Sequence, residues 1–252
     1  MTFKDLHRAQ EATLICNVWD VESARIAQQL QYDAIGTSSA AIASTLGYED
    51  GEKMSFQELA YIVGRITQST NIPLTVDLEG GYSRQPDQIV EHIKQLIDMG
   101  VVGINLEDSI VREKREILPV TIFSKTLESI CTSLHRQGLN MFLNVRTDAF
   151  LLGLPQARQD TIQRGQQYQE AGADGLFVPC VEKAQDIQAI ADALDLPLNV
   201  MCMPNLPDFA TLSQLGVKRI SMGNFAYDSS RRALEDKLSW IRHSHSFQNL
   251  FA

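Results

Sequence analysis

The amino-acid sequence predicts an α/β protein that folds as a single-domain (β/α)8 TIM barrel. Three observations point to this fold. Eight short apolar runs recur along the 252 residues, amphipathic segments of helical length separate most of them, and several runs follow a glycine that would end the preceding helix. A doubly wound open sheet is the alternative, but neither a GxGxxG turn after the first run nor a Walker A sequence supports it.

The eight apolar runs have the length of strands that are buried on both faces. Four stretches show the pattern most clearly, because each passes from a helix end through a glycine into an apolar run that ends in polar residues: 96–109, 135–148, 168–180 and 212–224. In chain order, the predicted strands lie near 14–18, 33–37, 73–78, 102–107, 140–146, 174–178, 198–202 and 218–222.

Helices are predicted between most of these strands, from apolar residues that repeat with helical spacing. The clearest segments are 55–70, 86–99 and 156–171, and Pro86 stands where the first turn of a helix tolerates proline. No linker-like or low-complexity segment divides the chain. We therefore expect residues 1–252 to form one barrel domain with a short C-terminal helical tail.

Composition and charge limit the class of protein. The chain is 44% hydrophobic and carries a formal net charge of -9, which argues against nucleic acid or an anionic membrane as a partner. No run approaches the length of a membrane span, and the opening MTFKDLHRAQ lacks the apolar core of a signal peptide. The four cysteines form no CxxC pair, so reduced thiols and a cytoplasmic location are expected.

Polar side chains gather near the ends of three neighbouring predicted strands. Side chains alternate across a strand, so one face of each strand can be read from its sequence. The inward-facing groups expected from the third, fourth and fifth strands are Thr75, Asp77 and Glu79, then Asn105 and Glu107, then Asn144, Arg146 and Asp148. They lie near the C-terminal ends of the strands, where barrel enzymes carry their chemistry.

Three of these acids would crowd one small volume. Asp77, Glu79 and Glu107 would repel one another and raise each other's pKa, and a hard divalent cation would remove the conflict. Mg²⁺ prefers oxygen ligands and keeps several of its waters, so it suits such a site. A cluster of salt bridges without a metal is the alternative that the spacing alone leaves open.

Five motifs in order resemble the isocitrate lyase/phosphoenolpyruvate mutase superfamily. They are NVWDVESARI (17–26), AIGTSSAAIASTLGYED (34–50), VDLEGGY (76–82), GVVGINLEDS (100–109) and NVRTDAF (144–150), and the resemblance runs from about residue 10 to residue 225. It implies a (β/α)8 barrel, a Mg²⁺ cofactor and a small 2-oxo or 2-hydroxy carboxylate or phosphonate as substrate. Members cleave or form C–C or P–C bonds next to an enolate.

The resemblance also implies roles for single residues. Asp77 matches the acid that binds Mg²⁺ directly. Glu79 matches a second acid, commonly Asp, that acts through water, and the longer Glu could bind directly or shift the ion. Glu107 matches a further water-mediated ligand, and Asp50 an acid near both metal and substrate.

The remaining implied roles concern the substrate. Thr37, Ser38 and Ser39 match a turn of small residues whose amides and hydroxyls hold a substrate carboxylate. Arg146 matches the arginine that grips a carboxylate or phosphonate, a bidentate role that suits guanidinium. Asn205, in CMPNLP, lies near a position that can hold a substrate carboxylate.

The loop after the fourth strand departs from the superfamily pattern. The lyase branch carries a KKCGH-type loop there, with a cysteine as acid or base, and the mutase branch uses a Lys and an Asn. Residues 109–121, SIVREKREILPVT, contain neither cysteine nor histidine nor asparagine, and Lys114 is displaced by one position from the mutase lysine. The loop is charged and is expected to act as a lid.

Taken together, the sequence predicts a Mg²⁺-dependent lyase or hydrolase that cleaves a C–C or P–C bond of a small 2-oxo or 2-hydroxy carboxylate through an enolate. The catalytic residues expected are Arg146, Asp50 and Lys114. Two alternatives stay open: a phosphoenolpyruvate mutase-like isomerase that uses Lys114, and a barrel that binds a carboxylate without turning it over.

A homo-oligomer is also expected, because related proteins often associate by exchanging a terminal helix. In this chain the last helix, near 228–243, has Leu234, Leu238 and Ile241 on one face. Since the tail is short, we expect this helix to pack on its own barrel instead of exchanging.

Overall fold

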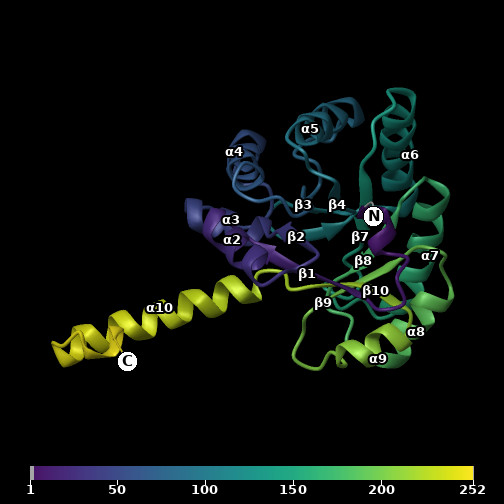
Figure 1. Cartoon of the computed structure of the whole chain (residues 1–252). Coiled ribbons are helices and arrows are strands. Elements are labelled where there is room, and N and C mark those ends of the chain that lie inside the picture. Colours follow the sequence, from purple (N-terminus) through teal and green to yellow (C-terminus); the bar gives the residue numbers. More distant parts are fainter. Residues whose placement is uncertain (1–2, 252) are drawn as a thin grey trace.

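The computed structural model describes residues 3–251, which form a closed barrel of parallel strands surrounded by helices (Figure 1). Around the barrel the strand order is β1-β10-β9-β8-β7-β4-β3-β2, and every neighbouring pair is parallel. The strands are β1 (Thr13–Val18), β2 (Ala34–Thr37), β3 (Leu74–Asp77), β4 (Gly103–Glu107), β7 (Phe142–Arg146), β8 (Gly175–Val178), β9 (Leu198–Met201) and β10 (Val217–Ser221). The predicted (β/α)8 fold is confirmed, and each predicted strand overlaps one strand of the barrel.

Helices cover the outer face of the barrel and bury the outward side chains of its strands, among them Val76, Leu78 and Ile104. The helices of the described residues are α1 (Phe3–Leu6), α2 (Val21–Gln29), α3 (Ser39–Leu46), α4 (Phe56–Thr67), α5 (Pro86–Asp98), α6 (Val120–Arg136), α7 (Ala157–Glu170), α8 (Ala184–Asp192), α9 (Phe209–Gln214) and α10 (Phe225–Ser244), followed by the 3-10 turn η1 (Gln248–Leu250). Within residues 3–251 no helix combines the length and the apolar composition needed to cross a membrane.

Local sequence explains where several helices begin. Asp20 caps α2 by accepting a hydrogen bond from the Ser23 amide, and Ser55 and Glu58 form a reciprocal capping box at α4. Pro86 is the first residue of α5, as predicted from its tolerance in a first turn. These caps satisfy backbone N–H groups that a helix start leaves without a partner.

The loop after β4 is folded as a short antiparallel hairpin. Its strands are β5 (Ser109–Val111) and β6 (Arg115–Ile117), and the Leu118 amide closes the hairpin by donating to the Asp108 carbonyl oxygen at 2.8 Å. The sequence predicts a charged loop at residues 109–121, and the hairpin was not expected. Two strands of three residues each are too short to produce a clear alternating pattern in the sequence.

The N-terminal end of the barrel is closed by aromatic rings. His7, just after α1, stacks on Phe142 of β7 with ring centroids 4.2 Å apart, and Phe3 meets both rings edge-on. Gly103 makes room for this plug, because a Cβ atom there would lie only 3.0 Å from the Phe3 ring. The plug makes this end an apolar structural base.

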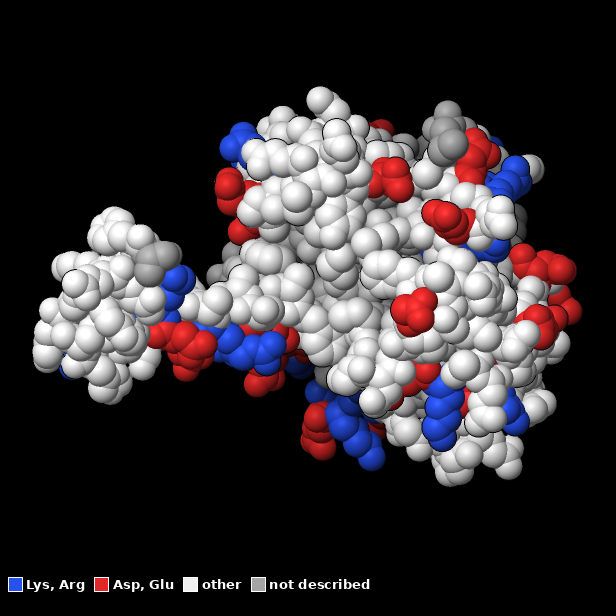
Figure 2. Space-filling model, turned by 60° about the horizontal axis from the view of Figure 1, so that its bottom comes forward, with Lys and Arg blue, Asp and Glu red and all other residues white. Residues whose placement is uncertain are grey.

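Helix α10 extends away from the barrel as an arm (Figures 1 and 2). None of its 20 residues is buried, and only its start touches the barrel, where Tyr227 packs edge-on against Trp19 and contacts the Ser44 hydroxyl. The expectation that the last helix packs on its own barrel is therefore wrong. The physical reason is the direction in which α10 leaves β10: it points outward, so the barrel does not cover the apolar face that includes Leu234 and Leu238.

The buried histidine of the plug predicts a pH dependence of stability. Burial, reinforced by the positive charge of Arg219, lowers the pKa of His7 from 6.5 to about 4. Above pH 6.5 the imidazole is neutral in both states. As the pH falls from 6.5 to 4, the unfolded chain gains a proton that the folded protein does not bind, so stability is lost. Two to three pKa units correspond to about 3 kcal/mol.

We therefore expect the free-energy difference between wild type and His7→Phe to change by about 3 kcal/mol between pH 7 and pH 4, as measured by urea unfolding. The variant should lose less stability on acidification. His135→Gln, which replaces an exposed histidine at the end of α6, is the matched control and should follow the wild-type profile. Parallel pH profiles for wild type and His7→Phe would contradict the assignment.

Candidate active site

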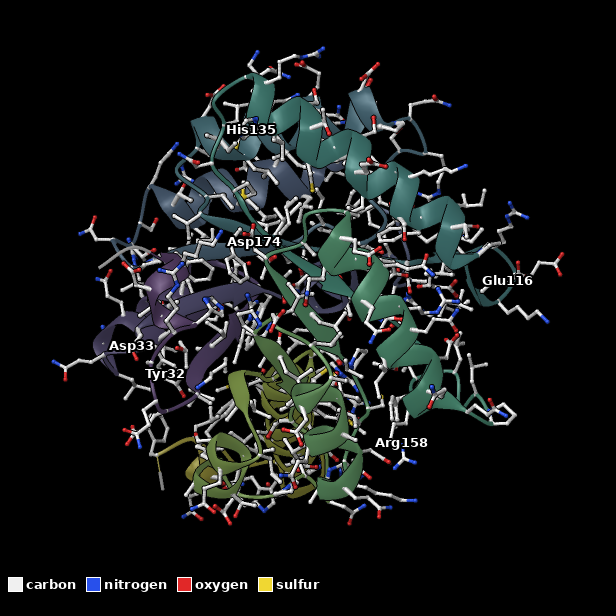
Figure 3. All side chains as sticks on the ribbon, turned by 90° about the vertical axis from the view of Figure 1, so that its right-hand side faces the viewer. Tyr32, Asp33, Glu116, His135, Arg158 and Asp174 are labelled. Atoms are coloured by element: carbon white, nitrogen blue, oxygen red, sulfur yellow. The ribbon has the colours of Figure 1, made fainter. Side chains whose placement is uncertain are left out.

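A cavity of about 270 Å³ opens at the C-terminal end of the barrel. Figure 3 shows this end marked by Glu116 and Arg158, opposite the end that carries Tyr32, Asp33 and Asp174. The cavity has a charged and polar side, with Asp50, Asp77, Asn105, Arg115 and Arg146, and an apolar wall, with Leu151, Phe177, Pro179 and Met201. A larger hollow of about 820 Å³ lies beside it, between the loops after β7 and β8, but the converging acids line the smaller cavity.

Asp77, at the end of β3, is held in place by the turn after β2. Its amide donates to the Thr37 hydroxyl at 2.9 Å, and its Oδ2 accepts a hydrogen bond from the Ser39 hydroxyl at 2.6 Å. The Ser38 hydroxyl accepts from the Ala41 amide and so caps α3. The hydroxyls of the predicted substrate-binding turn are thus used to orient Asp77 and to start a helix, while Ser38 and Ser39 still line the cavity.

The other oxygen of Asp77 stands open. Its Oδ1 is buried and has no hydrogen-bond partner among the described residues, although the residue lines the cavity. A buried carboxylate oxygen without a partner is unusual and costly, so it marks a position where a ligand belongs.

Glu79 is close to Asp77 but is tied to the surrounding loops. Its carboxylate accepts hydrogen bonds from the Glu52 amide at 2.6 Å and from the Tyr82 hydroxyl at 2.7 Å. Burial, and then the negative charge of Asp77, raises the pKa of Glu79 to about 8. With both oxygens engaged, Glu79 acts in this structure as a clamp on the segment around Glu52.

Glu107 and Asp148 share two arginines. Arg146 donates to Asp148 from Nε and Nη2, at 2.7 and 3.2 Å, and its Nη1 lies 3.0 Å from Glu107 Oε2 as an ion pair without hydrogen-bond geometry. Arg115 bonds Glu107 Oε1, lies 3.1 Å from Asp148 Oδ2 and reaches Asp50 Oδ2 at 3.1 Å. Ser109 also donates to Asp148, at 2.7 Å. This part of the site is the salt-bridged cluster that the spacing left open.

The arginines decide the charge state of these two buried acids. Burial alone would raise the pKa of Asp148, but Arg146 and the hydrogen bonds from Arg146 and Ser109 outweigh burial and lower it. For Glu107 burial prevails and raises its pKa, with Arg146 and Arg115 acting against it. The same acids, opposing the effect of burial, raise the pKa of both arginines, which stay protonated.

Arg115 is the functional residue that the sequence analysis missed. It is the first residue of β6, paired with Val111 across the hairpin, and its side chain turns into the cavity. Lys114, which the analysis chose instead, lies exposed in the turn, and no described contact brings it to the cavity. The sequence did indicate a basic residue in the predicted lid. The register of the hairpin was needed to choose Arg115 over the adjacent Lys114.

Two further predicted residues lie at the edge of the site. Asp50 is half exposed at the rim and is held by Arg115. Asn205 is exposed in the loop after β9, where its amide and side chain donate to Glu182 at 3.3 and 3.2 Å. It is not among the described residues that line the cavity.

A magnesium ion fits this arrangement if it binds through the Asp77 carboxylate and takes its remaining ligands from water and substrate. Among residues 3–251, no group of three or more His, Cys, Asp or Glu side chains is arranged to hold a metal. Among the described residues, both oxygens of Glu79 accept hydrogen bonds, and both oxygens of Glu107 lie against arginines, Oε2 as an ion pair without a hydrogen bond. Asp77 Oδ1 is buried at the cavity and is engaged by neither kind of contact from these residues. Mg²⁺ often binds through one or two carboxylates, with water and substrate oxygens completing its shell, and the donor set is compatible with that mode.

The fold and the site define the class: a (β/α)8 barrel whose strand ends hold acids and arginines around a cavity sized for a small anion. A family model described as phosphoenolpyruvate phosphomutase matches residues 3–242. The chain belongs to this family, as its motifs predicted.

Individual relatives agree with this assignment. An uncharacterised protein of Mycobacterium tuberculosis H37Rv is 32% identical over 240 residues, which cover 91% of this chain and 84% of that protein. The oxaloacetate decarboxylase of Paraburkholderia xenovorans LB400 is 28% identical over 242 residues, 92% of this chain and 79% of that one. The crystal structure of a candidate phosphonomutase from Burkholderia cenocepacia J2315 matches with a TM-score of 0.88 and 35% identity, covering 94% of this chain and 97% of that chain.

Because Glu107 and Asp148 share two arginines, replacing Arg146 should lower the free energy of unfolding by an amount that depends on pH. Arg146→Met leaves buried Asp148 and Glu107 with only Arg115 to compensate them. Removing one partner of a buried ion pair typically costs about 3 kcal/mol or more. We expect the free energy of unfolding, measured with urea, to fall by that amount at pH 8. The loss should be smaller at pH 5, because at that pH a carboxyl group that lacks its cation can take up a proton.

The matched control is Arg158→Met, which removes a half-exposed arginine from its ion pair with Asp186. Exposed pairs contribute little, so this change should cost less than about 1 kcal/mol at both pH values. Equal losses for the two variants, or a loss at Arg146 that does not vary with pH, would refute the charge-balance explanation.

Proposed function

We propose that this protein is a Mg²⁺-dependent lyase that cleaves a C–C bond beside the carbonyl of a small 2-oxo dicarboxylate, with oxaloacetate as the first candidate. The observation that carries the proposal is the free Oδ1 of Asp77 in a cavity that also holds Arg115 and Arg146. The similarity to an oxaloacetate decarboxylase along nearly the whole chain supports this choice of substrate.

The chain's own residues suit a small dianion. Arg146 lines the cavity and is fixed to Asp148 through Nε and Nη2, while its Nη1 is paired with Glu107 at 3.0 Å but makes no hydrogen bond there and can donate to a substrate carboxylate. The start of α3, at Ser39 and Ala40, also lines the cavity, and a helix N-terminus favours an anion. The chemistry that Mg²⁺ would supply at Asp77 is Lewis-acid polarisation of the 2-oxo group, which stabilises enolate charge.

Decarboxylation fits the groups that surround the cavity. The C3–C4 bond of oxaloacetate breaks, its electron pair passes into the enolate of pyruvate, CO₂ leaves, and water supplies the proton at C3. Among the described residues that line the cavity there is no cysteine, histidine or lysine. The reaction needs no such general acid. The apolar wall that includes Phe177 and Met201 can desolvate the departing carboxylate, which favours the loss of CO₂.

The first test replaces the proposed metal ligand. Asp77→Asn keeps an acceptor for Ser39 but removes the charge, so with Mg²⁺ and oxaloacetate we expect pyruvate formation to fall at least about 100-fold. EDTA should abolish wild-type turnover, and excess Mg²⁺ should restore it. Because Mg²⁺ also decarboxylates oxaloacetate in solution, the rate without protein is subtracted throughout. Asp33→Asn, an exposed acid at the opposite end of the barrel, is the control.

Other outcomes decide among the alternatives. Pyruvate from 2-methylisocitrate, but not from oxaloacetate, would replace the substrate while keeping C–C cleavage. Pyruvate from phosphonopyruvate would instead indicate hydrolysis of a P–C bond. Phosphoenolpyruvate from phosphonopyruvate would support the mutase. Oxalate binding without turnover of any candidate would favour a barrel that only binds carboxylates, and would overturn the enzymatic proposal.

We also propose that α10 associates with a second copy of the chain. Large apolar side chains on α10 are exposed, including Leu234 and Leu238 at 57 and 55%, and Phe247, just after the helix, is exposed at 65%. Apolar side chains repeated along one helix face usually bury themselves against a partner. Figure 2 shows the arm standing clear of the barrel, with charged residues along its middle.

The double variant Leu234→Ser/Leu238→Ser should therefore be monomeric at concentrations where wild type is an oligomer, as measured by sedimentation velocity. Tyr61→Ser, which removes an equally exposed side chain from α4, should leave the assembly unchanged. A monomeric wild type, or a double variant that still assembles, would refute the proposed role of α10.

A further inference from the structure

The layer of the barrel interior directly beneath Asp77 is polar. Barrel interiors are usually filled with branched apolar side chains. Here Asn144 donates from Nδ2 to Asn105 Oδ1 at 2.8 Å and to Asn199 Oδ1 at 3.0 Å, which joins β4, β7 and β9 across the interior. All three asparagines are buried. The layer is therefore a connected polar floor under the cavity.

Arg219 of β10 completes this floor and is the least satisfied residue in it. Its side chain is almost fully buried, with a relative exposure of 2%. Its Nη2 makes one long hydrogen bond, 3.4 Å, to Asn105 Oδ1, while Nε and Nη1 have no partner among residues 3–251. None of the ion pairs formed by the described residues includes it. A buried charge without an ion pair is expensive, so packing alone does not explain this arginine.

Two charged or titratable groups face Arg219 along the barrel axis. His7 lies toward the apolar plug, where Arg219 helps to keep it neutral. Asp77 lies toward the cavity, and its negative charge opposes the effect of burial, which lowers the pKa of Arg219 to about 10. The guanidinium is therefore protonated at neutral pH and its charge acts on the cavity floor.

Water is the expected link between Arg219 and the cavity. The Thr75 hydroxyl, on β3 two residues before Asp77, is also buried without a partner, as is Asp77 Oδ1. Several unsatisfied donors and acceptors in one interior are the normal setting of ordered buried water. Such water would transmit the orientation of Arg219 to Asp77 without direct contact.

We propose that Arg219 is a positioning residue whose fixed positive charge, acting from beneath Asp77, makes the cavity bind its cation and its anionic substrate as a pair. Asp50 and Asp77 line the cavity, and Glu107 and Asp148 lie against its two arginines. Against Arg115 and Arg146 alone, these acids would attract a divalent cation strongly and repel a dianion. A third positive charge weakens binding of the cation by itself and strengthens binding of the anion. The inference rests on the proposed function, since it assumes both ligands.

The test measures the two ligands separately, because the proposal predicts effects of opposite sign. Binding of Mn²⁺ alone is followed by electron paramagnetic resonance of the free ion, and binding of oxalate with saturating Mg²⁺ by calorimetry. In Arg219→Gln, which loses the charge but can still form hydrogen bonds, we expect Mn²⁺ to bind about tenfold more tightly and oxalate about tenfold more weakly. Arg219→Lys keeps the charge and should stay within about threefold of wild type for both ligands.

A second variant guards against a folding defect. Arg219→Met replaces an unpaired buried charge with an apolar side chain of similar length, so its thermal midpoint should equal or exceed that of wild type. It should show the same opposite changes in Mn²⁺ and oxalate affinity. Arg25→Met, on the exposed surface of α2, removes one positive charge far from the cavity and should change neither affinity.

The outcomes separate this inference from the proposed function. Three results would overturn the role of Arg219. The affinities for both ligands could fall together with the thermal midpoint, they could stay unchanged, or they could change equally in Arg219→Lys and Arg219→Gln. A wild-type protein that binds neither Mn²⁺ nor oxalate would instead overturn the proposed function, and the inference with it. Opposite shifts in the charge-removing variants alone would support the inference.

Discussion

Acidic side chains from two strands and three loops meet at one end of this barrel, and their mutual repulsion constrains the arrangement of the other residues there. Arg146 holds Asp148 by two hydrogen bonds and touches Glu107, while Arg115 bridges Glu107 and Asp148 to Asp50. Without these cations the buried carboxylates could not stay ionised together. Charge balance thus explains how Asp77 can leave one oxygen open beside Glu107, whose two oxygens both face arginines.

The hairpin after β4 contributes to this charge balance through Arg115. Because Arg115 sits at the start of β6, the charges of the cavity help to hold the hairpin down, and the hairpin in turn supplies one of the two arginines at the mouth. The same ion pairs that charge the cavity therefore also hold the hairpin in place.

The two ends of the barrel have different physical characters. At the N-terminal end Phe3, His7 and Phe142 form a packed aromatic plug, in which the histidine is kept neutral. Toward the other end the interior becomes polar, first with the asparagine floor and Arg219, then with the acids of the cavity. The plug supplies stability, whereas the polar floor costs stability, as is common where residues serve a function, which fits the role proposed for Arg219.

The sequence by itself determined the barrel, all eight of its strands and the inward direction of Asp77, Glu107 and Arg146, because strand alternation and the glycine-bounded apolar runs are local patterns. It also led to the family. Only the tertiary structure decided that Arg115, and not Lys114, enters the cavity, that Asn205 turns to Glu182, and that α10 leaves the barrel. These outcomes depend on hairpin register, on partners distant in the chain and on the direction in which a helix departs, and no local pattern encodes such long-range geometry.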